Sequence, residues 1–94
     1  MRIEKIVIPA SILAKLHWKH HVSEEEVDQV LRGKPKLFFV EKGNIRGEDV
    51  YLALGKTEGG RYLSIFFVYK VNKTVIVISA RDMTKKERIR HEKK

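Results

Sequence analysis

Residues 61–81 contain the feature that most constrains the fold, because two runs of β-branched and aromatic residues flank the polar pair Asn72-Lys73. Runs of this kind on either side of two turn-forming residues are typical of a β-hairpin. A two-residue turn at this pair places Val71 opposite Thr74, and the pairing then continues outward along both strands. The sequence therefore predicts an antiparallel hairpin, around which the other elements must be arranged.

Side chains alternate between the two faces of a strand, so this register assigns each hairpin residue to a face. One face is apolar and predicts the hydrophobic core; its members are Leu63, Ile65, Phe67, Tyr69, Ile76, Ile78 and Ala80. The other face is apolar in its middle and carries Lys70 towards one end and Arg81 at the other. Cations at the ends of such a face indicate either a binding surface or an ordinary strand rim.

Two helices are expected before the hairpin. The first follows Pro9, with Ser11 as a possible N-cap, and ends near His21. The second opens with Ser23 and Glu26, which have the spacing of a capping box, and acidic residues in its first turn suit the helix dipole. Only one or two residues separate these helices, so they are expected to form a helical hairpin or corner.

Strands are also expected at residues 37–41 and 50–54, with a possible short first strand within residues 3–8. A last helix from about Lys85, preceded by a second capping-box pattern, is expected to be short and basic. Helices followed by a run of closely linked strands indicate an α+β fold. The predicted architecture is thus an N-terminal helix pair on a four-stranded antiparallel sheet, with a basic C-terminal helix.

Composition narrows the class of protein. At this length, residues 1–94 are expected to form a single domain, and a hydrophobic content of 43% is that of a globular chain. The chain has no cysteine, which excludes disulfides and thiolate metal sites. No secretory leader or apolar run of membrane-spanning length is recognisable, so a cytoplasmic protein without a membrane partner is expected.

The formal net charge of +8 is unevenly distributed. Residues 1–33 are neutral, with five basic and five acidic residues. Residues 34–80 hold eight basic and four acidic residues, and residues 81–94 hold seven and three, so each segment has an excess of four. A basic surface concentrated on one part of a small domain favours a nucleic acid or an acidic protein as partner.

Several kinds of chemistry find little support in the sequence. His17, His20 and His21 include a pair four residues apart, but no third ligand is evident, so neither a metal nor another cofactor is expected. The glycines of residues 55–60 match neither the dinucleotide fingerprint nor the Walker pattern. His20, beside Lys19, is either a half-buried helix residue or a group that moves protons near neutral pH.

Arg81 is the most informative cation, because it ends an apolar strand and begins the basic tail. It is either a sheet-edge residue paired with an acid such as Asp82 or Glu87, or a guanidinium fork that binds phosphate. Lys70 has the same two interpretations with less specificity. Glu87 is explained by the capping box alone.

These residues resemble a known family, the BrnT-type toxins, which have the broader RelE-like fold. Ile-Ser-Ala-Arg at 78–81, followed by Thr-x-x-Glu-Arg at 84–88, is similar to the C-terminal signature of that family. Lys-His-His-Val-Ser at 19–23 resembles its Lys-His-Gly-Val-Ser element, and residues 53–61 resemble its Ala-Leu-Gly and Gly-Arg hairpin. Together the matching segments extend over about residues 12–90.

The resemblance implies a helix pair packed on an antiparallel sheet, and a metal-independent ribonuclease of a type II toxin–antitoxin system. It also implies a cognate antitoxin as protein partner, of the ribbon-helix-helix type. Three positions depart from the family pattern: His21 replaces a glycine, and Lys70 and Val77 stand where arginines are frequent. A lysine is a point charge and valine has none, so neither reproduces the bidentate binding of arginine.

The first hypothesis is therefore an RNA-cleaving toxin in which a ribose 2′-hydroxyl attacks the adjacent phosphate. Arg81 and Lys70 are assigned to the phosphate and His20 to proton transfer. Contacts with the RNA are assigned to Lys19, Arg61, Lys85, Lys86 and Arg88. The alternative, which the missing arginines favour, is a non-catalytic module of the same fold that binds RNA or an antitoxin through this basic face.

Overall fold

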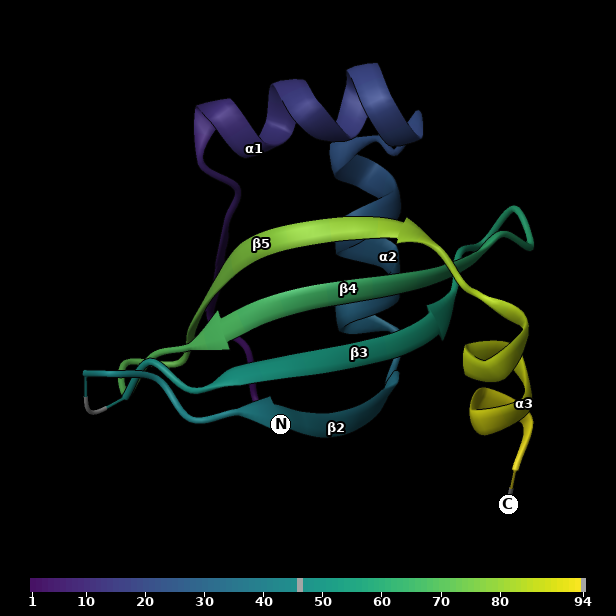
Figure 1. Ribbon diagram of the computed structural model, residues 1–94. Coiled ribbons are helices and arrows are strands. Elements are labelled where there is room, and N and C mark those ends of the chain that lie inside the picture. Colours follow the sequence, from purple (N-terminus) through teal and green to yellow (C-terminus); the bar gives the residue numbers. More distant parts are fainter. Residues whose placement is uncertain (46, 94) are drawn as a thin grey trace.

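The computed structural model describes residues 1–45 and 47–93 and has three helices, a π-helical turn and five strands (Figure 1). In chain order these are β1 (Lys5–Val7), α1 (Ala10–Lys15), η1 (Leu16–His20), α2 (Glu24–Arg32), β2 (Lys36–Glu41), β3 (Val50–Lys56), β4 (Tyr62–Tyr69), β5 (Thr74–Asp82) and α3 (Lys85–Glu92). Figure 1 shows α1 along the β5 edge of the sheet, α2 behind the strands and α3 beyond the end of β5.

The strands form one sheet in the order β1-β5-β4-β3-β2. Strands β2 to β5 form an antiparallel meander, as predicted from the short connections between them. The possible first strand is present and pairs parallel to β5, with Ile6 opposite Val75, which makes the sheet mixed. The α+β prediction is confirmed, with a fifth strand added to the predicted four.

The β4–β5 hairpin turns through three residues rather than two. The Lys70 N–H donates to the Thr74 carbonyl at 2.8 Å, and the Lys73 N–H donates to the Lys70 carbonyl at 2.9 Å. Lys73 adopts a left-handed conformation with φ of 65°, which closes a three-residue hairpin loop. Tyr69 therefore lies opposite Val75, and the predicted two-residue turn is wrong because Lys73 takes up a conformation usually reserved for glycine or asparagine.

A register shift on β5 restores the predicted pairing at the outer end of the hairpin, where Ser64 lies opposite Arg81. Between the two registers Ile78 is an extra residue on β5, and it is 40% exposed. Consequently Val75 and Val77, rather than Ile76 and Ile78, face the core on the inner half of this strand. The predicted core positions of Ile76 and Ile78 are wrong for this reason.

The N-terminal helices form the expected corner and cover one face of the sheet. Helix α1 begins after Pro9, as predicted, but Ser11 does not cap it, because Pro9 is the N-cap and the Leu13 N–H donates to the Pro9 carbonyl. The corner turns at His21, which has φ of 51°, and the Val22 N–H then donates to the Leu16 carbonyl. The buried helical side chains Leu16, Val22, Val27, Val30 and Leu31 meet the sheet residues Ala53, Leu63, Ile65, Phe67, Val75, Val77 and Ala80.

Both predicted capping boxes are present, at Ser23 with Glu26 and at Thr84 with Glu87. Each uses contacts three residues apart, which is why the sequence alone is enough to identify them. Helix α3 buries no side chain fully, and its one aliphatic residue, Ile89, is exposed. This helix is therefore held mainly by polar and cation–π contacts rather than by apolar burial.

Candidate nucleic-acid interface

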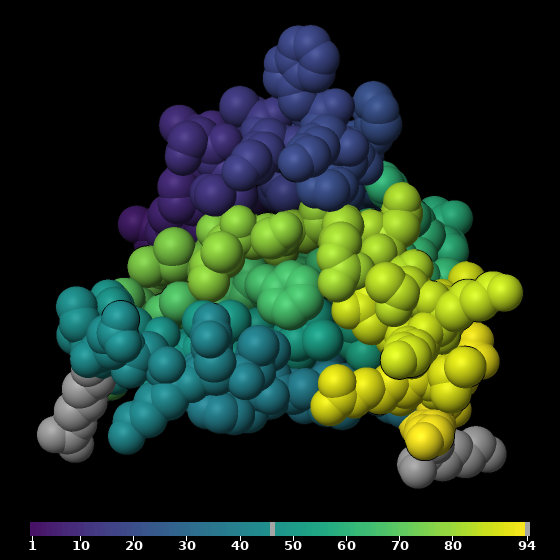
Figure 2. All heavy atoms as spheres, viewed as in Figure 1, coloured from purple at the N-terminus to yellow at the C-terminus, as the bar shows by residue number. Residues whose placement is uncertain are grey.

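The face of the sheet opposite α1 and α2 is open in its middle and bounded by α3 at one end (Figure 2). Ser64 and Phe66 point to this face, because they alternate along β4 with the core residues Leu63, Ile65 and Phe67. Arg81 pairs with Ser64 across β4 and β5 and so belongs to the same face. The open face thus carries an arginine at the point where β5 leads into α3.

Arg81, Glu87 and Ser64 form a hydrogen-bonded cluster at this point. Arg81 Nη1 donates to Glu87 Oε1 at 2.7 Å, and Arg81 Nη2 donates to Glu87 Oε2 at 2.9 Å. The Ser64 hydroxyl donates to Glu87 Oε1 at 2.7 Å. One carboxylate therefore orients the guanidinium in a bidentate geometry while it also caps α3 through the Thr84 N–H.

The Glu87 carboxylate is ionised well below neutral pH. Its hydrogen bonds from Arg81 lower its pKa from 4.5 to about 2, with smaller contributions from Thr84 and Ser64, against the opposing effect of burial. The same contact raises the pKa of Arg81. At neutral pH this carboxylate is therefore a fixed anion that orients Arg81, and a group with so low a pKa is a weak general base.

Arginines lie over aromatic rings along the junction of α3 with the open face. The pairs, with guanidinium-to-ring distances, are Arg81 with Phe66 (5.4 Å), Arg88 with Tyr62 (3.6 Å) and Arg90 with Phe38 (3.7 Å). Cation–π contacts of this kind hold each guanidinium near an apolar surface while its N–H groups stay available. Aromatic rings interleaved with arginines are typical of surfaces that bind single-stranded nucleic acid.

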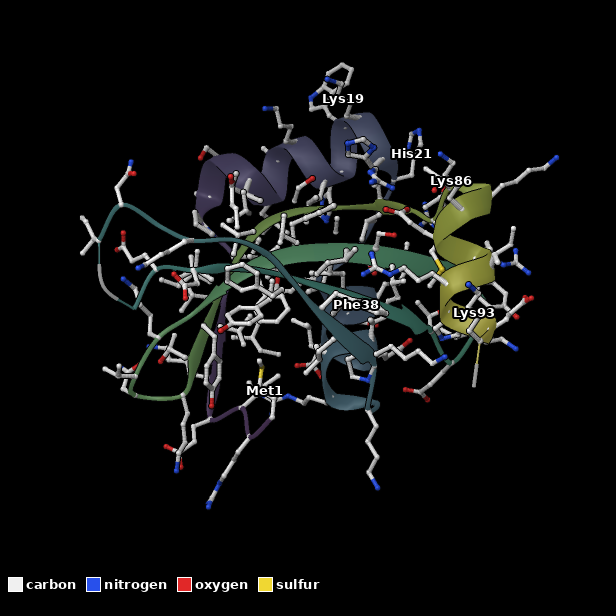
Figure 3. All side chains as sticks on the ribbon, turned by 60° about the horizontal axis from the view of Figure 1, so that its bottom comes forward. Met1, Lys19, His21, Phe38, Lys86 and Lys93 are labelled. Carbon is white, nitrogen blue, oxygen red and sulfur yellow. The ribbon has the colours of Figure 1, made fainter. Side chains whose placement is uncertain are left out.

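Only some of the lysines predicted to contact RNA lie near this junction. Lys85 and Lys86 are exposed in the first turn of α3, and Lys19 is exposed near the end of η1. Figure 3 shows Lys86 projecting from α3, with Phe38 and Lys93 beside the same helix. Lys85, Lys86 and Arg88 therefore share one helix with the arginine–aromatic pairs, whereas Lys19 belongs to the helical corner.

Lys70 lies far from Arg81. Ser64 is opposite Arg81, and Lys70 follows six residues later along the same extended chain, which corresponds to about 20 Å. Lys70 Nζ also contacts Glu48 Oε1 at 2.6 Å. The structure therefore does not bring these two cations to one phosphate, and a role for Lys70 in RNA binding stays a prediction for a more distant part of the face.

Arg61 has internal partners for its guanidinium. Its Nε donates to Asp82 Oδ1 at 2.7 Å, its Nη1 donates to the His21 carbonyl at 2.7 Å, and its Nη2 donates to the His20 carbonyl at 2.8 Å. Nη1 also contacts Glu26 at 3.2 Å, and these acids raise the pKa of Arg61. The side chain thus ties the helical corner to the end of β5, and its predicted contact with RNA would compete with these bonds.

His20 is half-buried at the end of η1, and its backbone carbonyl and the Asp82 carboxylate both accept hydrogen bonds from Arg61. The pKa of Asp82 is lowered, chiefly by its hydrogen bond from Arg61 and to a lesser extent by the charge of His20. Asp82 directly follows Arg81, so the two side chains point to opposite faces of β5. His20 therefore lies near the same end of β5 as Arg81 but on the helix side of the sheet. The hydrogen bonds from Arg61 to the His20 and His21 carbonyls hold this corner in place.

Sequence reasoning misses the parts of the site that depend on contacts across the sheet. In the sequence Glu87 is explained as a helix cap, and its second role at Arg81 requires the β5–α3 corner to be known. In the sequence alone, the aromatic residues Phe38, Tyr62 and Phe66 are recognisable only as strand formers. The available signal is the Arg-x₅-Glu spacing, together with arginines at alternate positions 88 and 90 after an aromatic-rich sheet.

Val77, one of the departures from the family pattern, lies in the core and is 1% exposed. It faces the helices, on the side of the sheet opposite Arg81. Within residues 1–45 and 47–93 there is no group of three or more His, Asp or Glu side chains that could hold a metal ion. No helix in the same residues is long and apolar enough to span a membrane.

Comparisons with known proteins identify one family and one similar solved fold. Residues 14–87 match the family model described as the ribonuclease toxin BrnT of type II toxin–antitoxin systems. The fold is similar to the crystal structure of the Brucella abortus ribonuclease toxin BrnT, with a TM-score of 0.63 and 18% sequence identity, over 86% of this chain and 97% of that one. No curated protein sequence matches the chain.

Proposed function

Because this chain belongs to the BrnT family of type II ribonuclease toxins, we propose that it cleaves RNA without a metal ion, at the Arg81–Glu87–Ser64 cluster. The observation that carries this proposal is the bidentate ion pair that orients Arg81 on the open sheet face, next to the arginines of α3. The family implies an antitoxin protein as partner and RNA as substrate. We propose that the antitoxin is of the ribbon-helix-helix type and that both proteins act in the cytoplasm.

The proposed reaction is an attack of a ribose 2′-hydroxyl oxygen on the adjacent phosphorus. The new P–O2′ bond forms as the P–O5′ bond breaks, which leaves a 2′,3′-cyclic phosphate and a 5′-hydroxyl. Charge accumulates on the non-bridging oxygens in the transition state, where a fixed cation lowers the barrier. Arg81 suits this role because its Nε–H and one N–H of Nη2 have no partner among the described residues, and its side chain is 32% exposed.

Proton transfer is assigned to His20, which takes the proton of the 2′-hydroxyl or returns one to the 5′-oxygen. An imidazole changes charge near neutral pH, whereas Glu87, with a pKa of about 2, does not. The assignment places the scissile bond at the end of β5, where His20 approaches from the helix side, near Asp82, and Arg81 from the open face. Glu87 and Ser64 are positioning residues, since they contact Arg81 and each other rather than the reacting atoms.

The proposal that no metal ion takes part is supported by the state of the carboxylates at this end of β5. The ionised carboxylate of Glu87 is paired with Arg81, and that of Asp82 is paired with Arg61. A magnesium ion is bound mainly through carboxylates and phosphates, so these arginines occupy the groups that such an ion would need. A guanidinium can supply the same electrostatic stabilisation to phosphate oxygens.

The flanking RNA is proposed to lie along α3 and the open face. Arg88 and Arg90 lie over Tyr62 and Phe38, which leaves the outer planes of their guanidinium groups for bases to stack on. Lys85 and Lys86 add charge at the start of α3. Lys70 is omitted from the reacting centre because of its distance from Arg81, and Arg61 is given a positioning role.

The test uses the purified chain, single-stranded RNA and excess EDTA. We expect cleavage that leaves 2′,3′-cyclic phosphate ends, and a decrease of about 10²-fold or more in kcat for Arg81→Ala. Arg81→Lys keeps the charge without the bidentate contact and should recover only part of the rate. Arg32→Ala is the matched control, because this arginine is paired with Asp28 on α2, away from the open face.

Two outcomes would contradict this proposal. Cleavage that stops on addition of EDTA would show that a metal ion is required. Binding of RNA without cleavage by the unmodified chain would identify a binding module, which is the alternative that the departure at Lys70 favours.

A further inference from the structure

Strand β2 is a free edge of the sheet. It ends the strand order and pairs on one side only, with β3 (Figure 1). A strand in this position presents a row of unpaired backbone N–H and C=O groups, which another extended chain can use. Phe39 and Val40 leave apolar surface at this edge, with Phe39 58% exposed.

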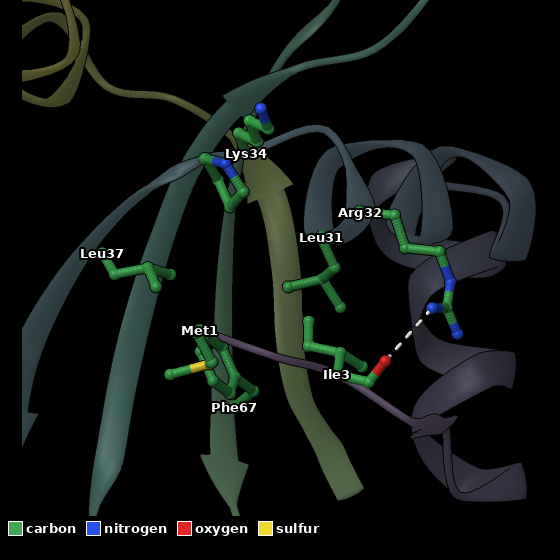
Figure 4. Close-up of a pocket in the computed structure, with 8 residues that line it drawn as sticks. Met1, Ile3, Leu31, Arg32, Lys34, Leu37 and Phe67 are labelled. Carbon is green, nitrogen blue, oxygen red and sulfur yellow. Dashed lines mark hydrogen bonds between the residues drawn. The ribbon is translucent and has the colours of Figure 1, made fainter. Parts of the chain in front are cut away.

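A pocket opens directly beside the start of this strand. Its volume is about 330 Å³, and its apolar lining comes from Met1, Ile3, Leu31, Pro35, Leu37 and Phe67 (Figure 4). Leu37 belongs to β2, so a residue paired opposite it on an added strand would have its side chain on the same face, within about 5.5 Å. At about 330 Å³ the pocket lies at the small end of the range of roughly 300–1,000 Å³ that ligand-binding clefts cover.

The charges around the edge favour an acidic occupant. Lys34 and Arg32 stand at the rim of the pocket, and Lys36 and Lys42 lie at the two ends of β2. Arg32 is already paired with Asp28, and Lys36 Nζ donates to the Lys93 carbonyl at the end of α3. Lys34 and Lys42 are exposed and have no partner among the described residues, so they are available to carboxylates on another chain.

We propose that the β2 edge is the docking site for an extended, acidic segment of the antitoxin, which adds a strand to the sheet and inserts an apolar side chain into the adjacent pocket. The inference rests on the antitoxin partner that belongs to the proposed function, but not on RNA cleavage. The backbone bonds of the added strand supply affinity, and the pocket and lysines select an apolar residue flanked by acids.

A second copy of this chain is a poorer occupant of the same edge. Residues 34–42 carry three lysines and one glutamate, a net charge of 3 − 1 = +2. Pairing two such edges would join segments of equal charge on chains that each carry +8. Lysines on an edge strand oppose self-pairing in this way, and they attract an acidic strand.

The experiment compares the free chain with its complex with its cognate antitoxin. Amide hydrogen exchange is expected to slow in residues 36–41 on binding, because an added strand protects the outward N–H groups. The double substitution Lys34→Glu/Lys42→Glu should weaken binding roughly tenfold, by charge reversal at the rim. Phe39→Ser should also weaken binding, and Lys15→Glu, an exposed charge reversal on α1, should have little effect.

Three results would overturn the docking site. Protection confined to α3 and the Arg81 cluster would show that the antitoxin binds the open face instead of the β2 edge. Equal effects of the Lys34/Lys42 and Lys15 variants would remove the charge argument. Protection of residues 36–41 in a dimer of the free chain, detected by sedimentation, would identify a second copy as the occupant. An RNA cleavage assay on the free chain is independent of all three, so failure of the nuclease proposal would be seen separately.

Discussion

Arg81 and Glu87 are joined by two parallel hydrogen bonds of 2.7 and 2.9 Å, across the corner where β5 leads into α3. The same carboxylate accepts the Ser64 hydroxyl and the Thr84 N–H, so one side chain links a strand, a helix cap and the neighbouring strand. Since α3 has little apolar burial, this carboxylate is expected to contribute strongly to the docking of the helix. Arg81 is thereby preoriented before RNA arrives.

Glu87 should make the free energy of unfolding depend on pH in the acidic range. Its pKa is about 2 in the folded chain, against an ordinary value of 4.5, so the stabilisation is fully present above pH 4.5 and is lost as the pH falls towards 2. We expect the free energy of unfolding to fall across this interval in the native chain, and to fall less in Glu87→Gln. Urea unfolding followed by circular dichroism at several pH values measures this, and parallel curves for the two proteins would contradict it.

Arg61 should matter more for stability than for RNA contact. Replacing it with alanine leaves Asp82, Glu26 and two corner carbonyls without their donor, and we expect a decrease of about 2–3 kcal/mol in the free energy of unfolding. Arg32→Ala removes an exposed pair with Asp28 and should cost under about 1 kcal/mol. Denaturant unfolding of both variants tests the difference. Similar small decreases would show that the Arg61 contacts are not stabilising.

His21 occupies a left-handed position, with φ of 51°, a conformation that glycine adopts most readily. A non-glycine side chain in this conformation costs roughly 1–2 kcal/mol. Glycine removes this cost, but the greater conformational entropy of glycine in the unfolded chain offsets part of the gain. His21→Gly is therefore expected to raise the thermal midpoint slightly, by a gain of about 0.5 kcal/mol in stability. His21→Val should lower it, because a β-branched residue is least tolerated there. Calorimetry of the three proteins decides the sign.

The cations of α3 should dominate binding to RNA. Each cation removed from a backbone phosphate is expected to reduce the slope of log K against log salt by about 0.7 for a single strand. Lys85→Gln/Lys86→Gln should therefore flatten the salt dependence, while Lys70→Gln, at the far end of the sheet and paired with Glu48, should change it little. Fluorescence anisotropy with labelled RNA over a range of salt concentrations provides the measurement. An equal effect of Lys70 would extend the RNA path along the whole face.

The sequence predicts those features that depend on neighbours in the chain. Capping boxes at Ser23 and Thr84 use contacts three residues apart, and strand character follows from runs of β-branched and aromatic residues. The outer hairpin register, with Ser64 opposite Arg81, is also predicted correctly. The inner register is not, because the left-handed conformation of Lys73 and the bulge at Ile78 carry no clear local signature.

By itself, then, the sequence determined the elements, their order and the basic character of the C-terminal half, since these follow from local spacing and composition. Only the tertiary structure decided which cations share a site. Arg81 meets Glu87 and Ser64 because a corner and a strand pairing bring them together, whereas Lys70 is held about 20 Å away on the same extended chain as Ser64. The tertiary structure also assigned Arg61 a structural role, because the partners of Arg61 come from segments 21 to 41 residues away in the sequence. Such contacts depend on the packing of helices against the sheet, which no local pattern specifies.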